Sequence, residues 1–210
     1  MTILAFEFSS ARRSVALARA GVVLAEAAET GGYRVTNAFG LTEKILAAAQ
    51  VSREEVAVIA VGIGPGSYTG IRAAIALAQG WQLARGIKLL GISSAECLAA
   101  QAQAQKIFGR VNVVIDAQRG EFYLAGWEIS EPERKVVSPL KIVPAAEIAA
   151  LTSAGQISVG PEQERLLFPD AATVARLAAA RTDFLAGEKM EPIYLRETAF
   201  LKAAPLTRNY

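Results

Sequence analysis

Two acidic residues stand where two apolar runs end, and a polar turn follows each of them. Glu7 closes "ILAFE" ahead of "FSSARR", and Asp116 closes "VVID" ahead of "AQRG". A pair of carboxylates can hold a metal ion and, through it, a phosphate group. Arg72 and Arg119 are the basic residues near these turns that could pair with an anion. Each acid can equally be the solvated end of a strand. Both interpretations stay open, and the candidate nucleotide-binding residues of the two turns are Glu7, Ser9, Asp116 and Arg119.

The segment "GIGPGSYTGIR" at positions 62–72 has the composition of a phosphate-binding loop. It lacks the Lys of a Walker A loop, and the spacing of its glycines matches neither G-x-G-x-x-G nor G-x-S-x-G. It would still present free N–H groups at the start of a helix, where an anion is favoured. Alternatively, its glycines allow a tight turn to approach neighbouring backbone. Gly64, Gly66 and Ser67 are therefore candidate ligand residues or purely structural ones.

Histidine is absent from the chain, and cysteine occurs once, at Cys97. Catalysis by Ser-His-Asp or Cys-His groups is thereby excluded, as are zinc sites built on histidine or on several thiolates. We therefore assign no catalytic residue and no metal site. Cys97 lies in an Ala-rich helical pattern, so we interpret it as a small buried residue.

The bulk composition favours a protein of the cytoplasm. The 210 residues are 52% hydrophobic, the net charge is +2, and no basic run marks a nucleic-acid surface. A single cysteine suits a reducing compartment. Neither a secretory signal nor an apolar run of about 18 residues is apparent, so we expect no contact with a membrane.

The order of predicted elements contains a repeat, in which three strands precede a helix, a strand and a second helix. We predict strands at 2–8, 13–19, 22–29, 56–63, 87–92, 111–115, 121–129, 135–143 and 156–160, and helices at 37–50, 70–85, 93–106, from Pro144, and at 170–181. A duplicated βββαβα unit is typical of the two-lobed α/β architecture of the actin/Hsp70-like proteins. We divide the chain into lobe one (1–106) and a shorter lobe two (107–210), and leave open that the tail packs back on lobe one.

The helix at 70–85 is apolar nearly all round, which indicates burial on more than one side. One face would cover the sheet of its own lobe, and either the next helix or a partner subunit would cover another. Small and aliphatic residues allow close helix packing. The candidate interface residues on this helix and the one before it are Leu41, Ile45, Ala74, Ala78 and Trp81.

Several segments together resemble the TsaB (YeaZ) family, which belongs to the glycoprotease-like group. "ILAFEFSSARRSVAL" is similar to the family's opening, "GPGSYTGIR" to its G-P-G-S-F-T-G-L-R motif, "DAQRGEFYLA" to D-A-R-R-G-E-V-Y, and "EPIYLR" to P-x-Y-L-R. The resemblance extends along nearly the whole chain.

This resemblance implies a non-catalytic subunit required for N6-threonylcarbamoyladenosine in tRNA. The partners it implies are a TsaD homologue, which performs the transfer, and the ATPase TsaE. TsaB proteins pair through the helices of lobe one, so it also implies a homodimer when the chain is alone and tRNA contact only through the complex. It implies no certain cofactor for the chain, with ATP or ADP and magnesium as candidates at the complex.

The chain departs from the family at Glu7, where Asp is usual, at "FSS" in place of T-S-T, and at "YRVTN" (33–37), where a His-Ser-Glu segment is common. These departures weaken the case for nucleotide chemistry in this chain. Two other functions remain as alternatives: an actin-like ATPase or kinase that uses Glu7 and Asp116, and a glycoprotease-like peptidase.

Overall fold

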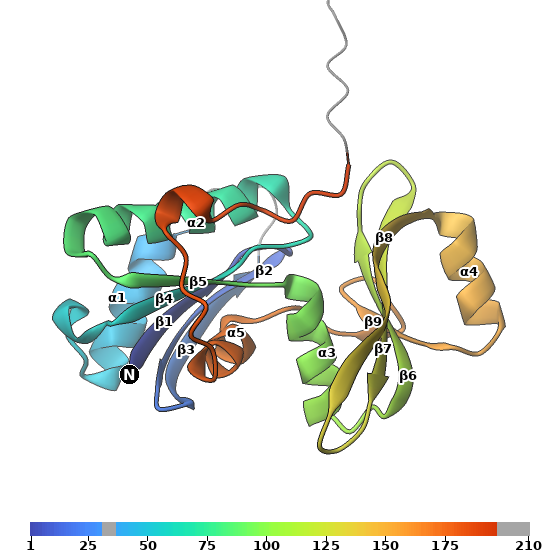
Figure 1. The fold of residues 1–210 in the computed structure, drawn as a ribbon, viewed down its shortest axis with the longest axis horizontal. Coiled ribbons are helices and arrows are strands. Elements are labelled where there is room, and N and C mark those ends of the chain that lie inside the picture. The colour runs from blue at the N-terminus through green and yellow to red at the C-terminus, as the bar shows by residue number, and fades with distance from the viewer. Residues whose placement is uncertain (31–36, 197–210) are drawn as a thin grey trace, which may run out of the picture.

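The computed structural model describes residues 1–30 and 37–196, and within them the chain forms two five-stranded sheets that lie side by side (Figure 1). The first sheet has the order β3-β2-β1-β4-β5 and the second has the order β10-β9-β6-β7-β8. Most of "YRVTN" and the last part of the tail lie outside the described residues. None of the helices within residues 1–30 and 37–196 combines the length and the apolarity that crossing a bilayer would need.

The first unit of the chain builds the first sheet. Its elements are β1 (Thr2–Glu7), β2 (Arg12–Arg19), β3 (Val22–Thr30), α1 (Ala38–Ala49), β4 (Val58–Gly62), α2 (Tyr68–Arg85), β5 (Lys88–Ile92) and α3 (Ser94–Ala104). Strands β1 to β3 form an antiparallel meander, and β4 and β5 add to β1 in parallel.

The second unit repeats this topology. Its elements are β6 (Gly109–Asp116), β7 (Glu121–Ile129), β8 (Arg134–Pro144), α4 (Ala145–Ser153), β9 (Ile157–Gly160), β10 (Arg165–Leu166) and α5 (Ala171–Ala179). Strands β6, β7 and β8 are antiparallel, and β9 and β10 continue from β6 in parallel. The equal strand orders and directions confirm the prediction of a duplicated two-lobed α/β fold.

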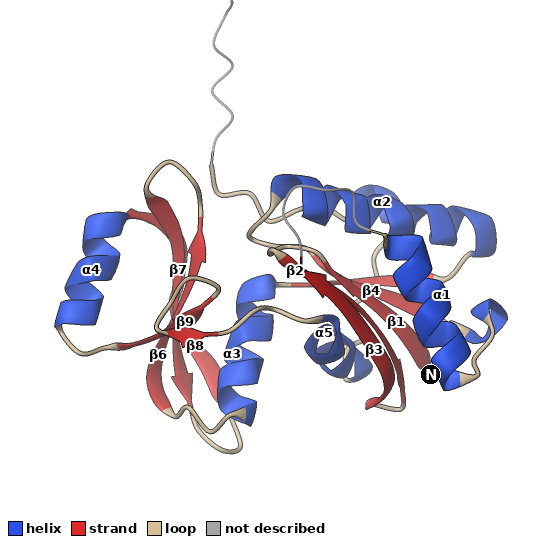
Figure 2. Ribbon diagram, turned by 180° about the vertical axis from the view of Figure 1, so that it is seen from behind, coloured by secondary structure: helices blue, strands red, loops and turns tan. Residues whose placement is uncertain are grey.

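Each unit sends its last helix to the sheet of the other unit. Helix α3 packs on the second sheet, where its Leu98 and Ala102 meet Val111 and Val113 of β6. Helix α5 packs on the first sheet, and Figure 2 shows it on the opposite face from α1 and α2. The predicted division at residue 106 follows the order of the repeats, whereas the packing crosses it at these two helices.

Alternation along the central strand explains how the first sheet is covered on both faces. In β1, Leu4 and Phe6 face α1 and α2, whereas Ile3 and Ala5 face α5. All four are at most 1% exposed. A strand buried on both faces reads as one continuous apolar run, which is why β1 and β4 are clear in the sequence.

Side-chain caps fix the starts of several helices. Asn37, Ser67 and Ser93 each accept a hydrogen bond from a backbone N–H three residues later, at the starts of α1, α2 and α3. The helices predicted from 37 and from 93 thus begin directly after Asn37 and Ser93, which serve as their caps. The prediction that Pro144 is the first helical residue is wrong: its backbone is extended, and it lies at the N-cap of α4 as the last residue of β8.

Candidate functional site

The glycine loop joins β4 to α2, and its polar backbone groups contact other parts of the same chain. The Ser67 amide donates to the Ser9 carbonyl at 2.7 Å, and the Gly64 carbonyl accepts from the Ser94 amide at 2.8 Å. The Ser67 hydroxyl accepts from the Gly70 amide at 3.3 Å, so it caps α2. The two sequence candidates Ser9 and Ser67 therefore meet through their backbones, at the contact between the glycine loop and the β1–β2 turn.

Two glycines make this contact possible. Gly66 has a φ of +145°, and a Cβ built on it would lie well inside 3.0 Å of the Ser9 carbonyl oxygen. A Cβ on Gly70 would overlap the Phe8 carbonyl oxygen in the same way. Any side chain at these positions would push the loop away from the turn. Gly64 is also constrained, because a Cβ there would come within 2.7 Å of Ile71.

Glu7 is fully buried beneath this loop. One carboxylate oxygen accepts from the Ser9 amide at 2.7 Å, and the other accepts from the Ser94 hydroxyl at 3.0 Å. Burial raises the pKa of Glu7 against the lowering effect of the hydrogen bonds from Ser9 and Ser94. A Cβ on Gly62 would overlap the carboxylate. Glu7 thus joins the end of β1 to β4 and to the start of α3, with both oxygens bonded to its own chain.

Asp116 ends β6 in the other lobe and shapes its own turn. One of its oxygens accepts from the Gln118 amide at 2.7 Å, and the other accepts from the Gln118 side chain at 2.5 Å. Arg119 lies exposed at the tip of the turn. Within residues 1–30 and 37–196, no group of three or more acidic or cysteine side chains is arranged to hold a metal ion. The two candidate acids each bond within the protein at the end of a strand.

Three of the candidate interface residues are in the core of the first lobe. Ala74 and Ala78 are 0% exposed and Ile45 is 1% exposed, all in the cluster between the first sheet and helices α1 and α2. They cannot contact a partner in this conformation, so the prediction that these three residues form an interface is wrong for this conformation. The small size of Ala74 and Ala78 lets α2 approach the sheet closely. Leu41 is half-buried against the same cluster, and Trp81 is half-buried at its edge.

A different stripe of α2 is open to solvent and forms an apolar surface with α1. A shallow depression of about 340 Å³ is lined by Phe39, Ala73, Ala76, Leu77, Gly80 and Trp81. Phe39 is 69% exposed, although it is a large aromatic residue. We call these six residues the α1/α2 surface. It offers no titratable group, so it suits contact with another apolar surface rather than chemistry.

The sequence contains a signal for this surface. In α2 the buried stripe follows positions 71, 74, 75 and 78, and a second apolar stripe follows 73, 76, 77, 80 and 81. Both have the i, i+3, i+4, i+7 spacing of one helix face. Two such stripes on one helix indicate two covered faces, but the pattern does not say which of them faces the sheet.

Cys97 of α3 is 0% exposed among small residues of α5 and the first sheet. Burial raises the pKa of its thiol well above the ordinary value. The interpretation of Cys97 as a buried packing residue is confirmed.

Comparisons with known proteins agree with the resemblance drawn from the motifs. A family model described as "TsaD: tRNA N6-adenosine threonylcarbamoyltransferase" matches residues 16–195. The tRNA threonylcarbamoyladenosine biosynthesis protein TsaB of Escherichia coli is 32% identical over 131 residues, which cover 62% of this chain and 57% of that protein. The chain thus spans somewhat over half the length of this curated relative.

Two solved structures from Pseudomonas aeruginosa extend the similarity to nearly the whole chain. A protein described as similar to peptidase YeaZ has a TM-score of 0.80 at 27% identity and covers 93% of this chain and 99% of its own. YeaZ from the same organism has a TM-score of 0.78 at 27% identity, and the match covers 92% of this chain and 99% of YeaZ. The chain therefore belongs to the family of the tRNA N6-adenosine threonylcarbamoyltransferase TsaD and, within it, to the TsaB (YeaZ) group.

Proposed function

We propose that this chain is a non-catalytic partner subunit in the formation of N6-threonylcarbamoyladenosine in tRNA. It would bind a TsaD homologue through the α1/α2 surface, self-associate through the same surface when alone, and meet TsaE and tRNA only in the complex. The observation that carries the proposal is this surface, because a large exposed aromatic residue beside an apolar depression is typical of a protein contact.

The two candidate acids, Glu7 and Asp116, give less support to a function in catalysis. Both oxygens of Glu7 are bonded to Ser9 and Ser94, and both oxygens of Asp116 are bonded to Gln118. A nucleotide or metal ion would have to displace these bonds. We therefore place any ATP or ADP with magnesium at the assembled complex and not at this chain alone.

The proposal is tested by placing a charge on the α1/α2 surface. Ala76 is exposed in the free chain, so Ala76→Glu should leave a folded monomer. A carboxylate buried without a partner costs several kcal/mol, so the affinity for the TsaD homologue should fall at least about 100-fold. Calorimetric titration measures the affinity for the TsaD homologue, and light scattering measures whether the chain alone is a monomer or a homodimer.

Leu166→Glu is the matched control, because Leu166 is a 59% exposed apolar residue in the second lobe. It should leave both associations unchanged. Binding by Ala76→Glu with the affinity of the parent chain would contradict the proposed surface.

The ATPase alternative has its own test. Titration of the isolated chain with ATP and magnesium should show no saturable binding. Binding that is lost in Asp116→Asn, with the melting temperature unchanged, would favour the alternative over the partner role.

A further inference from the structure

The C-terminal part of the described chain crosses from the first lobe to the second. After α5 the Leu185 amide donates to the Leu89 carbonyl at 2.9 Å, so the chain runs beside β5. A 3-10 turn at Gly187–Lys189 then lies against α2. From there the chain continues toward the second lobe, as the red segment of Figure 1 shows.

Polar residues of α2 hold this segment. The Gln79 side chain donates to the Gly187 carbonyl at 2.8 Å, and the Gln82 side chain accepts from the Gly187 amide at 2.6 Å. They are two of the few polar residues on a largely apolar helix. Their role in the fold is to anchor the segment that leads to the second lobe.

Residues 193–196, which we call the strap, contact both lobes. The Ile193 amide donates to the carbonyl of Ile63, directly after β4, at 2.8 Å. The Arg196 guanidinium donates to the Ala117 carbonyl at 3.1 Å and forms an ion pair with Glu121. The strap thus connects the glycine loop of the first lobe to the β6–β7 turn of the second.

The middle of the strap is fixed on the start of α2. The ring of Tyr194 stacks on that of Tyr68 with centroids 5.5 Å apart. The Arg72 guanidinium lies 4.6 Å from the Tyr68 centroid, and its Nε donates to the Tyr194 hydroxyl at 3.2 Å. Two side chains of the first lobe, Tyr68 and Arg72, therefore hold Tyr194 of the strap, independently of the strap's contact with the second lobe.

We propose that the strap is a reversible latch between the lobes, closed by the contacts of Arg196 with the β6–β7 turn. The contacts of Tyr194 with Tyr68 and Arg72 keep the strap on the first lobe, so opening the latch would free the second lobe and not the strap. The Arg196 and Glu121 side chains are 32% and 43% exposed, and an ion pair so accessible to water is readily broken. This inference goes beyond the proposed function, because it concerns the lobe arrangement and not the α1/α2 surface.

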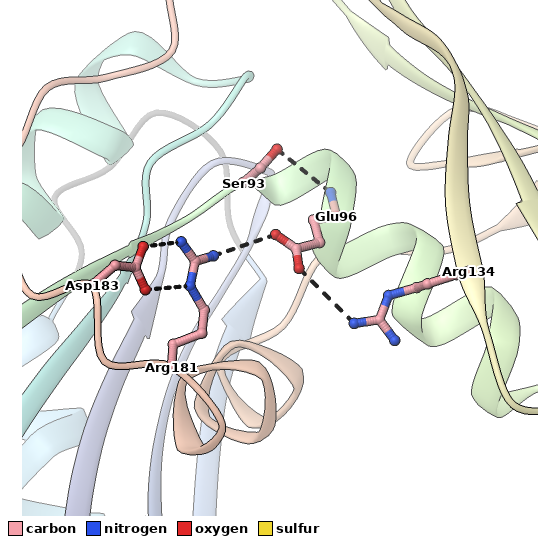
Figure 3. Close-up of polar contacts among 5 residues, drawn as sticks. All are labelled: Ser93, Glu96, Arg134, Arg181 and Asp183. Carbon is pink, nitrogen blue, oxygen red and sulfur yellow. Dashed lines mark hydrogen bonds and ion pairs between the residues drawn. The ribbon is translucent and has the colours of Figure 1, made fainter.

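A second polar link between the lobes lies at the first turn of α3 (Figure 3). Glu96 of α3 lies 3.9 Å from the Arg134 guanidinium of β8 and 3.6 Å from that of Arg181 after α5. A hydrogen bond from Arg181 holds the pKa of Asp183 at about 2. Helix α3 carries the chain between the lobes, and its Leu98 and Ala102 are buried against the second sheet, so this helix stays joined to the second lobe when the polar contacts break. With the latch open, the lobes would turn about α3.

The test measures the distance between the lobes with spin labels. Glu54→Cys and Lys135→Cys place labels at exposed positions of the first and second lobes, and the native Cys97 is 0% exposed and does not compete for the label. We expect electron–electron double resonance to give one narrow distance distribution in the parent chain. Arg196→Ala should add a second, longer component.

The controls separate the latch from a general loss of stability. Arg119→Ala, which removes an exposed Arg from the same turn, should leave the distribution unchanged. Arg196→Glu combined with Glu121→Arg should give a narrower distribution than Arg196→Glu alone. Glu121→Gln breaks the ion pair at nearly constant volume and serves in place of Arg196→Ala if that variant does not fold. A distribution unchanged by loss of the ion pair overturns the proposal, as does a charge exchange without recovery.

Discussion

Gly66→Ala tests the idea that the glycine loop exists to contact the β1–β2 turn. The φ of Gly66 is +145°, a conformation that costs an L-residue about 1–3 kcal/mol. The new Cβ would also overlap the backbone of Ser9, which cannot rotate away as a side chain would. The loop must move, so the hydrogen bond from the Ser67 amide to the Ser9 carbonyl is lost at a cost of about 1 kcal/mol.

Together these terms predict a loss of about 2–4 kcal/mol from the free energy of unfolding. For a chain of this length each kcal/mol lowers the melting temperature by about 2–4 °C, so we expect a decrease of about 10 °C. Thermal unfolding followed by circular dichroism or calorimetry measures it.

Gly86→Ala is the control for the conformational part alone. Gly86 has a φ of +66°, and a Cβ on it would meet nothing within 4 Å. Its cost should be about 1 kcal/mol, or a few degrees. If Gly66→Ala melts within about 2 °C of Gly86→Ala, the close approach contributes little and the reasoning is refuted.

Three further changes test other parts of the structure. Glu7→Gln can keep both hydrogen bonds, because the Ser94 hydroxyl can accept from the new amide. The pKa of Glu7 is raised in the folded protein, so this group stabilises the fold below its unfolded pKa of 4.5, and that contribution is lost as the pH rises through the folded pKa. Gln does not titrate. The melting temperature of Glu7→Gln relative to the parent should therefore increase with pH between these two pKa values. Gly80→Ala, in an exposed helix interior with nothing within 4 Å, should stabilise the monomer by about 0.5–1 kcal/mol in denaturant titrations. Ala78→Glu should give an unfolded or aggregated product by circular dichroism, because Ala78 is 0% exposed; a folded Ala78→Glu monomer would contradict its place in the core.

Local patterns predicted the elements well, because their causes are local. The run from Val58 to Gly62 is apolar and β-branched, and Ser93 offers a cap directly before an Ala-rich segment. The duplicated order of strands and helices was enough to predict two lobes with the same topology. The short strand β10 was missed because its two residues, Arg165 and Leu166, are exposed and carry no alternation.

The destinations of the helices could not be read from the sequence. An amphipathic helix shows which of its sides is apolar, but not which sheet that side covers. Helices α3 and α5 therefore appear in the sequence as the last elements of their own units, although each packs on the other sheet. The same limit explains the choice of Ala74 and Ala78 as interface residues, since a small residue permits close packing against a sheet as well as against a partner.

Each side of α2 has a different neighbour, and this makes the Ala76→Glu test specific. One side, which includes Ile71 and Ala78, packs on the first sheet. Another holds the chain's own C-terminal segment through Gln79 and Gln82, which explains polar residues on so apolar a helix. Among the described residues, the side with Ala76 borders an open depression instead. A partner that binds the apolar side of α2 next to α1 would meet the α1/α2 surface without displacing the C-terminal segment, and a charge placed at Ala76 tests that contact.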